Sequence, residues 1–504
     1  MSKNNPRLVT MMLGAVIASI TFAGLAGPSW ASGKSKGLFP LGETTPVPRL
    51  SDKPLPFAKI QERPALPVEL GCKFLGTGNL KKGIALPTGA VWTPCLWMFG
   101  TLRTAFQTYD SVGPEGRNTE FAARLDWFTN LQLTSTEKCI VGLSPLDKNR
   151  FTNFTRHSFE SNQGLEDGQG ELGIFVRAAF CEGDFGSLFP NLDPRGTNLI
   201  DYGFSFGRQQ ITFQEGIMVN DTLDSIGVVR NNLHAPGFSN IRITGLWAFD
   251  SIDRGTVGNR QRLNEGGFFG LFTQADTSAS TFAVDLITIQ DDDNDSTGGD
   301  GYYIGLSSIQ RGFKPWPWGV SGEINTAYRI NASISENDDT PQVTDGVLLS
   351  AEFSWTPHSS DDVVYMNPFV GINRYSQAGR EPIVGGPLAA LGISFASPSL
   401  GNHLSELSSF NTEVVGAAIG YQAFWDNHRR NLVLEIAAVK DNSRDLLKSK
   451  GDGNDAVAFS VQFQQAIGRR VSCSGTASFQ PWKAETMGPA PALRSLLSFD
   501  RRAS

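Results

Sequence analysis

Hydrophobic and polar residues alternate along most of the chain from about residue 97 onward. The clearest run spans 318–330, where Trp318 and Tyr328 belong to a largely apolar face and Glu323 and Arg329 belong to the opposite face. A period of two is the pattern of a β-strand whose two faces meet different surroundings. No long segment shows the apolar spacing of three and four that a helix requires. The sequence therefore predicts an all-β fold.

The same alternation recurs in many segments of similar length. It predicts strands at 121–133, 172–180, 202–213, 241–249, 282–289, 347–356, 364–372, 415–425, 432–440 and 457–464. Between the runs lie polar stretches rich in Asn, Asp and Gly, namely 291–301, 331–346 and 450–455. This composition is typical of hairpin connections. Their unequal lengths favour short turns at one end of the fold and long loops at the other.

The length of the repeating region fits a membrane barrel. Residues 97–504, divided over 16 to 18 strands, give roughly 23 to 26 residues per strand and connection, which accommodates the roughly 9–11 residues that cross a bilayer. A soluble sandwich would show turn signals every 8–12 residues or so. We therefore expect a transmembrane antiparallel up-and-down β-barrel of about 16–18 strands.

The polar face of these strands carries many charges in mid-strand. A packed core cannot hold so many ions, since each unpaired buried charge costs several kcal/mol, whereas a water-filled lumen can. The alternative is that they lie on the solvated face of a soluble sheet. The predicted pore-lining residues are Arg103, Arg124, Asp126, Arg177, Arg208, Arg242, Asp285, Glu323, Arg329, Glu352, Arg374 and Glu435. Aromatic residues near strand ends suit interfacial girdles: Trp127, Trp247, Trp318, Tyr328, Trp355 and Trp425.

Composition narrows the class of protein. Of the 504 residues, 40% are hydrophobic and 18% charged, a balance that does not suit a disordered chain. The formal net charge is −7, which argues against a nucleic-acid partner, because phosphates require a basic surface.

The N-terminal region reads as an export signal followed by an extension. Residues 1–31 combine a positive start at Lys3 and Arg7, an uncharged apolar stretch and small residues before a cleavage site at Ala31. A membrane-anchoring helix is the alternative. Residues 32–96 begin with a proline-rich stretch, predicted to be an extended periplasmic segment or tether. The alternative is a segment tucked into the mouth of the main domain. The barrel is expected over 97–504.

Five cysteines are present: Cys72, Cys95, Cys139, Cys181 and Cys473. None has the spacing of a metal or redox motif. In an oxidising compartment Cys72 and Cys95 could close a local loop, and Cys139 and Cys181 could link neighbouring hairpins. The pairing stays open, because singly buried cysteines fit the sequence equally well.

As a pattern, residues 97–504 resemble Gram-negative outer-membrane porins. Within them, Tyr202–Phe213 contains a Gly-Arg-Gln element (207–209) similar to one in alginate-export-like and related porins. This resemblance implies passive diffusion of small hydrophilic solutes, anionic or sugar-like ones included. The chain departs from the pattern at its end, where Phe499 stands five residues before the C-terminus in place of a terminal aromatic residue.

A constriction is expected in one unusual segment. Residues 379–392 contain glycines and prolines that prevent a regular central strand. The segment is predicted either to fold inward, with Arg380 and Glu381 facing each other across the pore, or to form an ordinary loop. Lumen arginines lower the barrier for anions and carboxylates raise it. The near balance of the two predicts weak selectivity.

The sequence offers no chemistry of its own. The five histidines lie mostly in predicted loops, and no catalytic or phosphate-binding motif occurs. The acidic run 291–295 lacks the spacing of an EF-hand. The sequence predicts no enzyme activity, no catalytic residue, no metal site and no cofactor.

Three functions remain in competition. The first is a channel in the cell outer membrane, surrounded by lipid and lipopolysaccharide and open to small solutes. The second is a non-conducting barrel that acts as a scaffold or receptor for a periplasmic partner. The third is a secreted β-rich periplasmic enzyme or sugar-binding protein. A homo-oligomer is compatible with the first, since porins often form trimers.

Overall fold

The computed structural model describes the greater part of the chain after residue 64. All of the described residues belong to one compact unit within 44–315 and 321–504, and the predicted signal and most of the proline-rich stretch lie outside them, as do Trp318 and residues 292–295 of the acidic run. The described ranges are 65–74, 83–110, 117–146, 155–159, 174–197, 199–256, 259–263, 266–291, 300–313, 322–335, 345–357, 360–381, 384–397, 400–401, 403, 405–426, 428–441, 455–467, 470–483 and 498–503.

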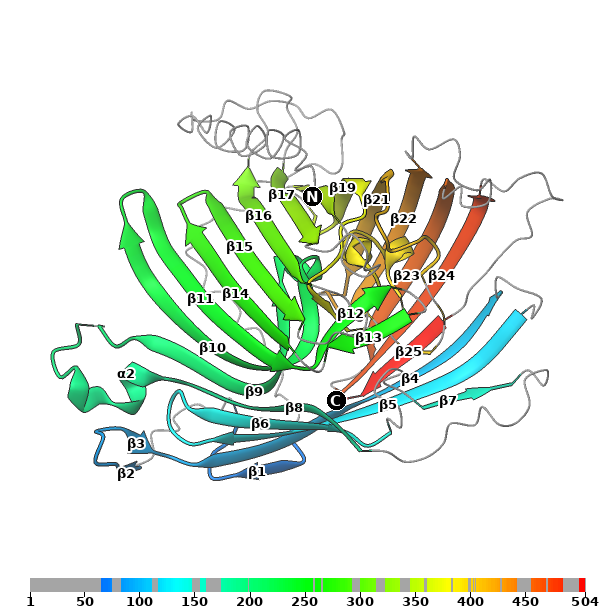
Figure 1. Ribbon diagram of the computed structural model, residues 1–504. Coiled ribbons are helices and arrows are strands. Elements are labelled where there is room, and N and C mark those ends of the chain that lie inside the picture. Colours follow the sequence, from blue (N-terminus) through cyan, green and yellow to red (C-terminus); the bar gives the residue numbers. More distant parts are fainter. Residues whose placement is uncertain are drawn as a thin grey trace, which may run out of the picture. The chain divides into compact units, whose positions relative to one another are not determined.

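Strands dominate the structure and form one large sheet (Figure 1). Of its 21 strands within the described ranges, β1, β7 and β20 are short additions, and the other 18 follow one another in a ring. These are β4 (Cys95–Asp110), β5 (Arg117–Gln132), β6 (Lys138–Ser144), β8 (Phe175–Asp184), β9 (Tyr202–Phe213), β10 (Val219–Ala235), β11 (Phe238–Asp250), β14 (Gly266–Asp276), β15 (Ser280–Asp291), β16 (Gly301–Phe313), β17 (Gly322–Ser335), β18 (Gly346–Pro357), β19 (Val363–Asn373), β21 (Val414–Trp425), β22 (Arg430–Asp441), β23 (Ala456–Ile467), β24 (Val471–Lys483) and β25 (Ser498–Ala503).

The ring closes because the last strand, β25, pairs with β4, and every neighbouring pair is antiparallel. The predicted antiparallel β-barrel is confirmed. Most connections at one end are short, such as 236–237, 277–279 and 426–429, and the other end has the long segments 251–265 and 374–413. Closure pairs the first strand of the ring with the last, as a strand-built membrane protein requires.

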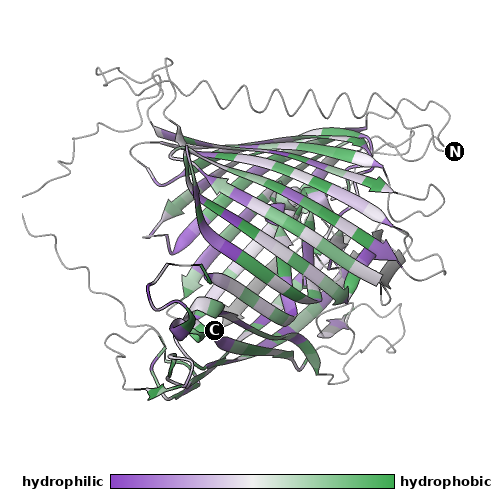
Figure 2. Ribbon diagram, turned by 60° about the vertical axis from the view of Figure 1, so that its left-hand side comes forward, coloured by the Kyte–Doolittle hydropathy of each residue, from purple (hydrophilic) through white to green (hydrophobic). Residues whose placement is uncertain are grey.

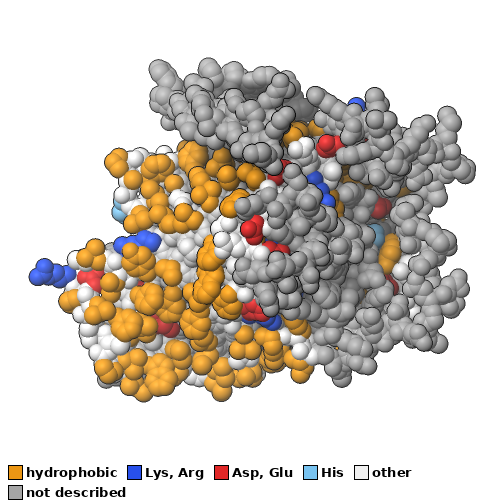
Figure 3. Space-filling model, in the orientation of Figure 1, with side chains coloured by type: hydrophobic (Ala, Val, Ile, Leu, Met, Phe, Trp, Pro, Cys, Tyr) orange, Lys and Arg blue, Asp and Glu red, His pale blue; other side chains and the backbone are white. Residues whose placement is uncertain are grey.

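The outer side of the sheet is apolar. Large hydrophobic side chains that are 37–53% exposed recur at every second position of β11, β15, β21, β22 and β23, among them Trp247, Leu286, Ile419 and Ile436. Figure 2 shows the resulting alternation of hydrophobic and hydrophilic residues along the strands, and Figure 3 shows hydrophobic side chains covering much of the described outer surface. The alternate positions point inward, as the pleat dictates.

Three segments fold into the barrel, and together we call them the internal segments. The tip of the β9–β10 hairpin, 209–223, includes the 3-10 helix η3 (Gln214–Gly216) and reaches the middle of β15 and β17. The connection 251–265 holds β12 (Ile252–Thr256) and β13 (Asn259–Leu263). The connection 374–413 holds β20 (Gly379–Arg380), η5 (Pro387–Ala390) and η6 (Ile393–Phe395).

The core of the molecule lies inside the barrel. One apolar cluster joins Leu388, Leu391 and Phe395 of segment 374–413 to inward residues of β18, β19 and β21–β23. A second joins Met218 and Val219 of the hairpin tip to inward residues of β11 and β14–β16, such as Phe268. The inward face was predicted to be polar throughout, and here it is apolar because the internal segments cover it and exclude water.

The remaining elements lie at the end with short turns. They are β1 (Val68–Leu70), which pairs with β4, a small hairpin of β2 (Ile84–Ala85) and β3 (Val91–Trp92), and the helices α2 (Phe185–Leu188) and η2 (Pro190–Leu192) of connection 185–201. At the loop end, β7 (Thr155–Ser158) pairs with β5 beyond β6. No helix in the described ranges is long and apolar enough to cross a membrane.

Cys72–Cys95 and Cys139–Cys181 form disulfides, so of the two interpretations that the sequence left open, pairs and singly buried cysteines, the structure has the pairs. Cys473 is the free cysteine of the described residues.

Candidate functional site

The wall made by β4, β5, β6 and β8 meets the internal segments mainly through polar groups. It supplies only Ala105 and Ala122 to the apolar clusters, where they pack on Leu400. Elsewhere on this wall the inward side chains include Arg103, Arg124 and several other polar residues. Because water and polar solutes need polar partners, this face is the candidate site.

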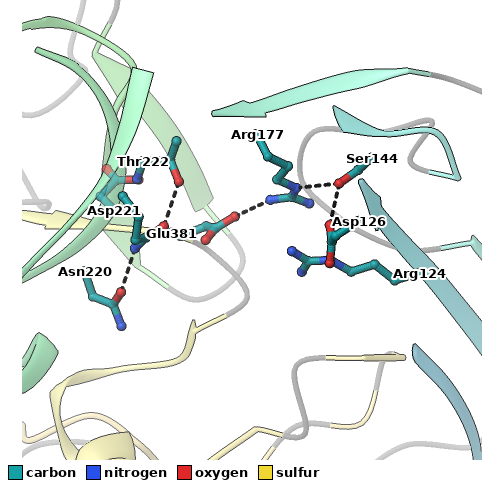
Figure 4. A network of polar contacts seen from close by, with 9 residues as sticks. Arg124, Asp126, Ser144, Arg177, Asn220, Asp221, Thr222 and Glu381 are labelled. Carbon is teal, nitrogen blue, oxygen red and sulfur yellow. Dashed lines mark hydrogen bonds and ion pairs between the residues drawn. The ribbon is translucent and has the colours of Figure 1, made fainter. Parts of the chain in front are cut away.

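Arg177 crosses from the wall to the internal segments (Figure 4). Its strand, β8, has a register shift against β6 at Gly142/Leu143, a β-bulge of the kind that re-aims a side chain. The guanidinium Nη1 lies 2.7 Å from Glu381 Oε1, and the two side chains are only 8% and 16% exposed. Its Nε donates to Ser144 Oγ at 3.2 Å. Arg177 is therefore fixed at both ends of its guanidinium.

The network continues along the wall from Ser144. Ser144 Oγ donates to Asp126 Oδ1 at 2.6 Å, and Arg124 Nε lies 2.7 Å from Asp126 Oδ2. Arg124, Asp126, Ser144 and Arg177 come from three adjacent strands. Asp126 holds Arg124 directly and is linked to Arg177 through the hydroxyl of Ser144.

Glu381 belongs to a rigid part of the internal segments. Its backbone N–H donates to the carbonyl of Asn220 at 2.8 Å, directly after β20 pairs in parallel with β10. Asp221 lies beside it with no exposed surface and accepts hydrogen bonds from the backbone N–H groups of Thr222 and Asp253, at 2.8 and 2.7 Å. Glu381 is thus the carboxylate of the internal segments that meets a cation of the wall, Arg177, while Asp221 supports the backbone beside it.

Arg380 takes a different position from the one predicted. Its guanidinium lies over the ring of Phe410, 5.0 Å from the centroid, while Glu381 meets Arg177. The cation opposite Glu381 is therefore Arg177 rather than Arg380, because adjacent residues of an extended chain point to opposite sides. Segment 379–392 does fold inward, and its Leu388 is fully buried.

Four other predicted site residues anchor the internal segments. Arg329 lies between Glu215 of the hairpin tip, at 2.6 Å, and Glu352 of β18. Asp285 accepts a hydrogen bond from Gln214 at 2.5 Å. The carboxylate of Glu435 accepts from the backbone N–H groups of Ile393 and Ser394 at 2.9 and 2.8 Å, which holds the start of η6.

The last predicted residues lie apart from this network. Arg208 pairs with Asp224 and donates to Ser251 at 3.0 Å, where the hairpin tip begins. Arg242 and Glu323 are exposed near the end with short turns, and Arg103 points inward from β4. Arg374 starts segment 374–413, where burial lowers the pKa of its guanidinium.

Sequence reasoning missed Ser144, Asp221 and the hairpin tip. Gln214 and Glu215 have φ of 52° and 55° and are followed by Gly216 at 85°, so three consecutive residues adopt the left-handed region. Such a tip is strained for residues other than glycine. The only signal in the sequence is the short Gln-Glu-Gly interruption between two alternating runs.

No family model matches the sequence, and no curated protein is significantly similar to it. Solved structures with the same fold exist. OccK9 (OpdG) of Pseudomonas aeruginosa aligns with a TM-score of 0.52 and 10% identity, over 81% of this chain and 97% of that one. A BenF-like porin from Pseudomonas fluorescens Pf-5 gives 0.52 and 8%, over 81% and 97%. Acinetobacter baumannii OccAB3 gives 0.50 and 11%, over 81% and 98%. The chain therefore has the β-barrel fold of the BenF-like porin.

Proposed function

We propose that the chain is a passive channel of the Gram-negative outer membrane for small hydrophilic solutes. The observation that carries this proposal is a closed sheet with an apolar outer side and ion pairs on its inner side. Only a closed sheet satisfies all strand backbone groups in lipid, and only a wet interior favours mid-strand charges. Lipid and lipopolysaccharide would surround it, and the chain would need no cofactor and catalyse no reaction.

The solute path would run between the β4–β8 wall and the internal segments. Polar side chains face each other there, whereas the other inner walls meet the internal segments through apolar clusters. Arg103, Arg124 and Arg177 on one side and Glu381 on the other would create a transverse field. The Arg177–Glu381 pair would be the narrowest point. Such a field favours solutes that carry an anionic group, and sugar-like solutes, as in the alginate-export-like porins, remain a prediction.

Single-channel recording on the purified protein in planar bilayers tests this function. The wild type should give stepwise conductance. The double variant Arg103→Gln/Arg124→Gln should shift the reversal potential in a salt gradient toward cations, because two wall cations are lost. Arg195→Gln is the matched control, since Arg195 is exposed in connection 185–201. An unchanged reversal potential would remove the arginines from the path.

A non-conducting scaffold is the second candidate. It is favoured by the three internal segments, which occupy much of the interior and bury two apolar clusters. A barrel that inserts into bilayers, migrates differently on gels with and without heating, and never conducts would support it over the channel. Whether copies associate is a separate proposal, tested by cross-linking in the membrane.

A further inference from the structure

Two short strands from opposite ends of the chain lie along one edge of β4. On its other edge, β4 pairs with β5 over its whole length, Cys95–Asp110. On this edge β25 covers only Leu102–Phe106, and β1 covers Leu96–Met98. Both run antiparallel to β4, so β1 continues the line of β25 after a gap of three residues of β4. The closing strand of the barrel is thus built from two parts.

Several contacts hold β1 at this place. The Cys72–Cys95 disulfide joins the second residue after β1 to the first residue of β4. Trp97 Nε1 donates to the carbonyl of Cys72 at 2.9 Å, and the ring of Phe74 packs edge-on against Trp97 at 5.2 Å. Gly71 lies between β1 and Cys72 and has a φ of 84°. A Cβ at this position would collide with the carbonyl of Pro94. The sequence is therefore fitted to this docking.

The residues around β1 also make a contact on the side away from β4. Arg470, in the turn just before β24, donates from Nη2 to the carbonyl of Ala65 at 3.2 Å. β24 is the other neighbour of β25. Residues 65–72 therefore contact β4 on one side and the turn that leads into β24 on the other.

We propose that residues 65–72 complete the closing strand of the barrel and that the Cys72–Cys95 disulfide is the lock that keeps them there. Backbone N–H and C=O groups left open along a strand edge are costly in or near lipid. A ladder of three residue pairs is too short to persist alone. The disulfide adds a short covalent link between β1 and β4 and so raises the effective concentration of β1 at the edge.

The second disulfide provides a matched control. Cys139 and Cys181 are directly opposite each other inside the continuous β6–β8 ladder. Backbone pairs flank them on both sides, so their strands stay in register without the sulfur bond. Removing this disulfide should therefore leave the seam between β4 and β25 unchanged.

Hydrogen exchange of the folded protein in detergent tests the lock. In Cys72→Ser/Cys95→Ser, peptides covering 66–70 and 96–98 should exchange about tenfold faster or more, because the short ladder opens without global unfolding. Cys139→Ser/Cys181→Ser should match the wild type at these peptides. If the first variant does not assemble, reduction of folded Cys139→Ser/Cys181→Ser with a phosphine gives the same comparison, because Cys72–Cys95 is then the disulfide that is cleaved.

A rescue experiment tests the register. Val68 faces Met98 in the β1–β4 ladder. Val68→Cys/Met98→Cys in the Cys72→Ser/Cys95→Ser background should form a new disulfide and restore the slow exchange. Unchanged protection after loss of Cys72–Cys95, or a new pair that does not cross-link, would overturn the proposal. Conductance plays no part in this readout, so the result is independent of the channel function.

Discussion

The interior of the barrel has two sides that differ in what joins the wall to the internal segments. On the side of β14–β16 and β18–β23 the joint is an apolar core, with Phe268 and Leu391 fully buried. On the side of β4–β8 the joint is the Arg177–Glu381 ion pair and its network. The apolar side gives the internal segments a fixed position, and the polar side gives water and solutes a surface to contact.

Charged residues follow the same division. Arg329, on the packed side, has a side chain that is 1% exposed and contacts two carboxylates. Arg124, on the polar side, has one carboxylate partner and a side chain that is 18% exposed. The same residue type thus anchors a segment on one side and lines a wall on the other.

The strongest way to break this division is to place a charge in the packed side. Leu391 has no exposed surface. Leu391→Asp should release segment 374–413, because an unpaired buried carboxylate costs several kcal/mol. Conductance should rise several-fold in single-channel records, and protease should cleave the segment. Leu391→Met keeps the volume and should leave both unchanged. A normal conductance in Leu391→Asp would mean that the core does not position the segment.

Two arginine substitutions, one on the packed side and one on the polar side, are expected to have different effects of intermediate size. Arg329→Gln leaves Glu215 and Glu352 without their shared cation. Their side chains are 53% and 29% exposed, so water compensates part of the loss, and the cost should stay below the roughly 3–5 kcal/mol of a fully buried pair. The substitution should loosen the hairpin tip, seen as faster hydrogen exchange at 209–223.

Arg124→Gln should shift ion selectivity with little change in hydrogen exchange, since a partly exposed pair contributes about 1 kcal/mol or less. Identical behaviour of the two variants would contradict the division.

The contact between the two sides can be tested by itself. Glu381→Gln removes the carboxylate that balances Arg177, so the path should become more selective for anions and its conductance should rise moderately. The swapped variant Arg177→Glu/Glu381→Arg should restore the pair and lower conductance toward the wild type. A swap that conducts like Glu381→Gln would show that the ion pair does not narrow the path.

The sequence predicts most strands of the barrel well, because hydrophobic and polar residues alternate where one face of a strand meets lipid and the other meets the interior. Strand β9 spans the predicted Tyr202–Phe213, and the predicted 347–356 is found at Gly346–Pro357. Of the predicted run 318–330, residues 322–330 belong to β17, which continues to Ser335, and 318–321 lie outside the described residues. Strand β10 was missed, because its residues 219–223 are buried inside the barrel and carry no alternation between lipid and water.

The candidate site could be predicted only in part, because alternation shows which residues point inward but not which groups they meet there. Period two identifies Arg124, Asp126 and Arg177 as inward residues, since it separates the two faces of a strand. It gives no information on what fills the interior, so the partners of Arg177 and Arg329 required the long-range folding of 209–223 and 374–413. Glu381 was found because its segment is irregular in composition.

The smallest expected effect is a dependence on pH. It arises where segment 374–413 reaches the polar wall through an aromatic contact. His403 lies against Tyr109 of β4, with ring centroids 5.0 Å apart. Burial lowers the pKa of His403 to about 4, whereas an exposed histidine has a pKa of about 6.5. Protonation therefore favours the released loop.

The contact should be at full strength above about pH 6.5 and should weaken as the pH falls toward 4, because a lowered histidine pKa means that the charged form is disfavoured in the folded state. Each unit of the difference corresponds to about 1.4 kcal/mol, and partial exposure reduces the total. Protease cleavage of segment 374–413 should increase between pH 7 and pH 4.5 in the wild type. In His403→Gln the increase should disappear, because glutamine does not titrate in this range. If the increase persists in that variant, other titratable groups would control the acid response, and the aromatic contact would only support packing.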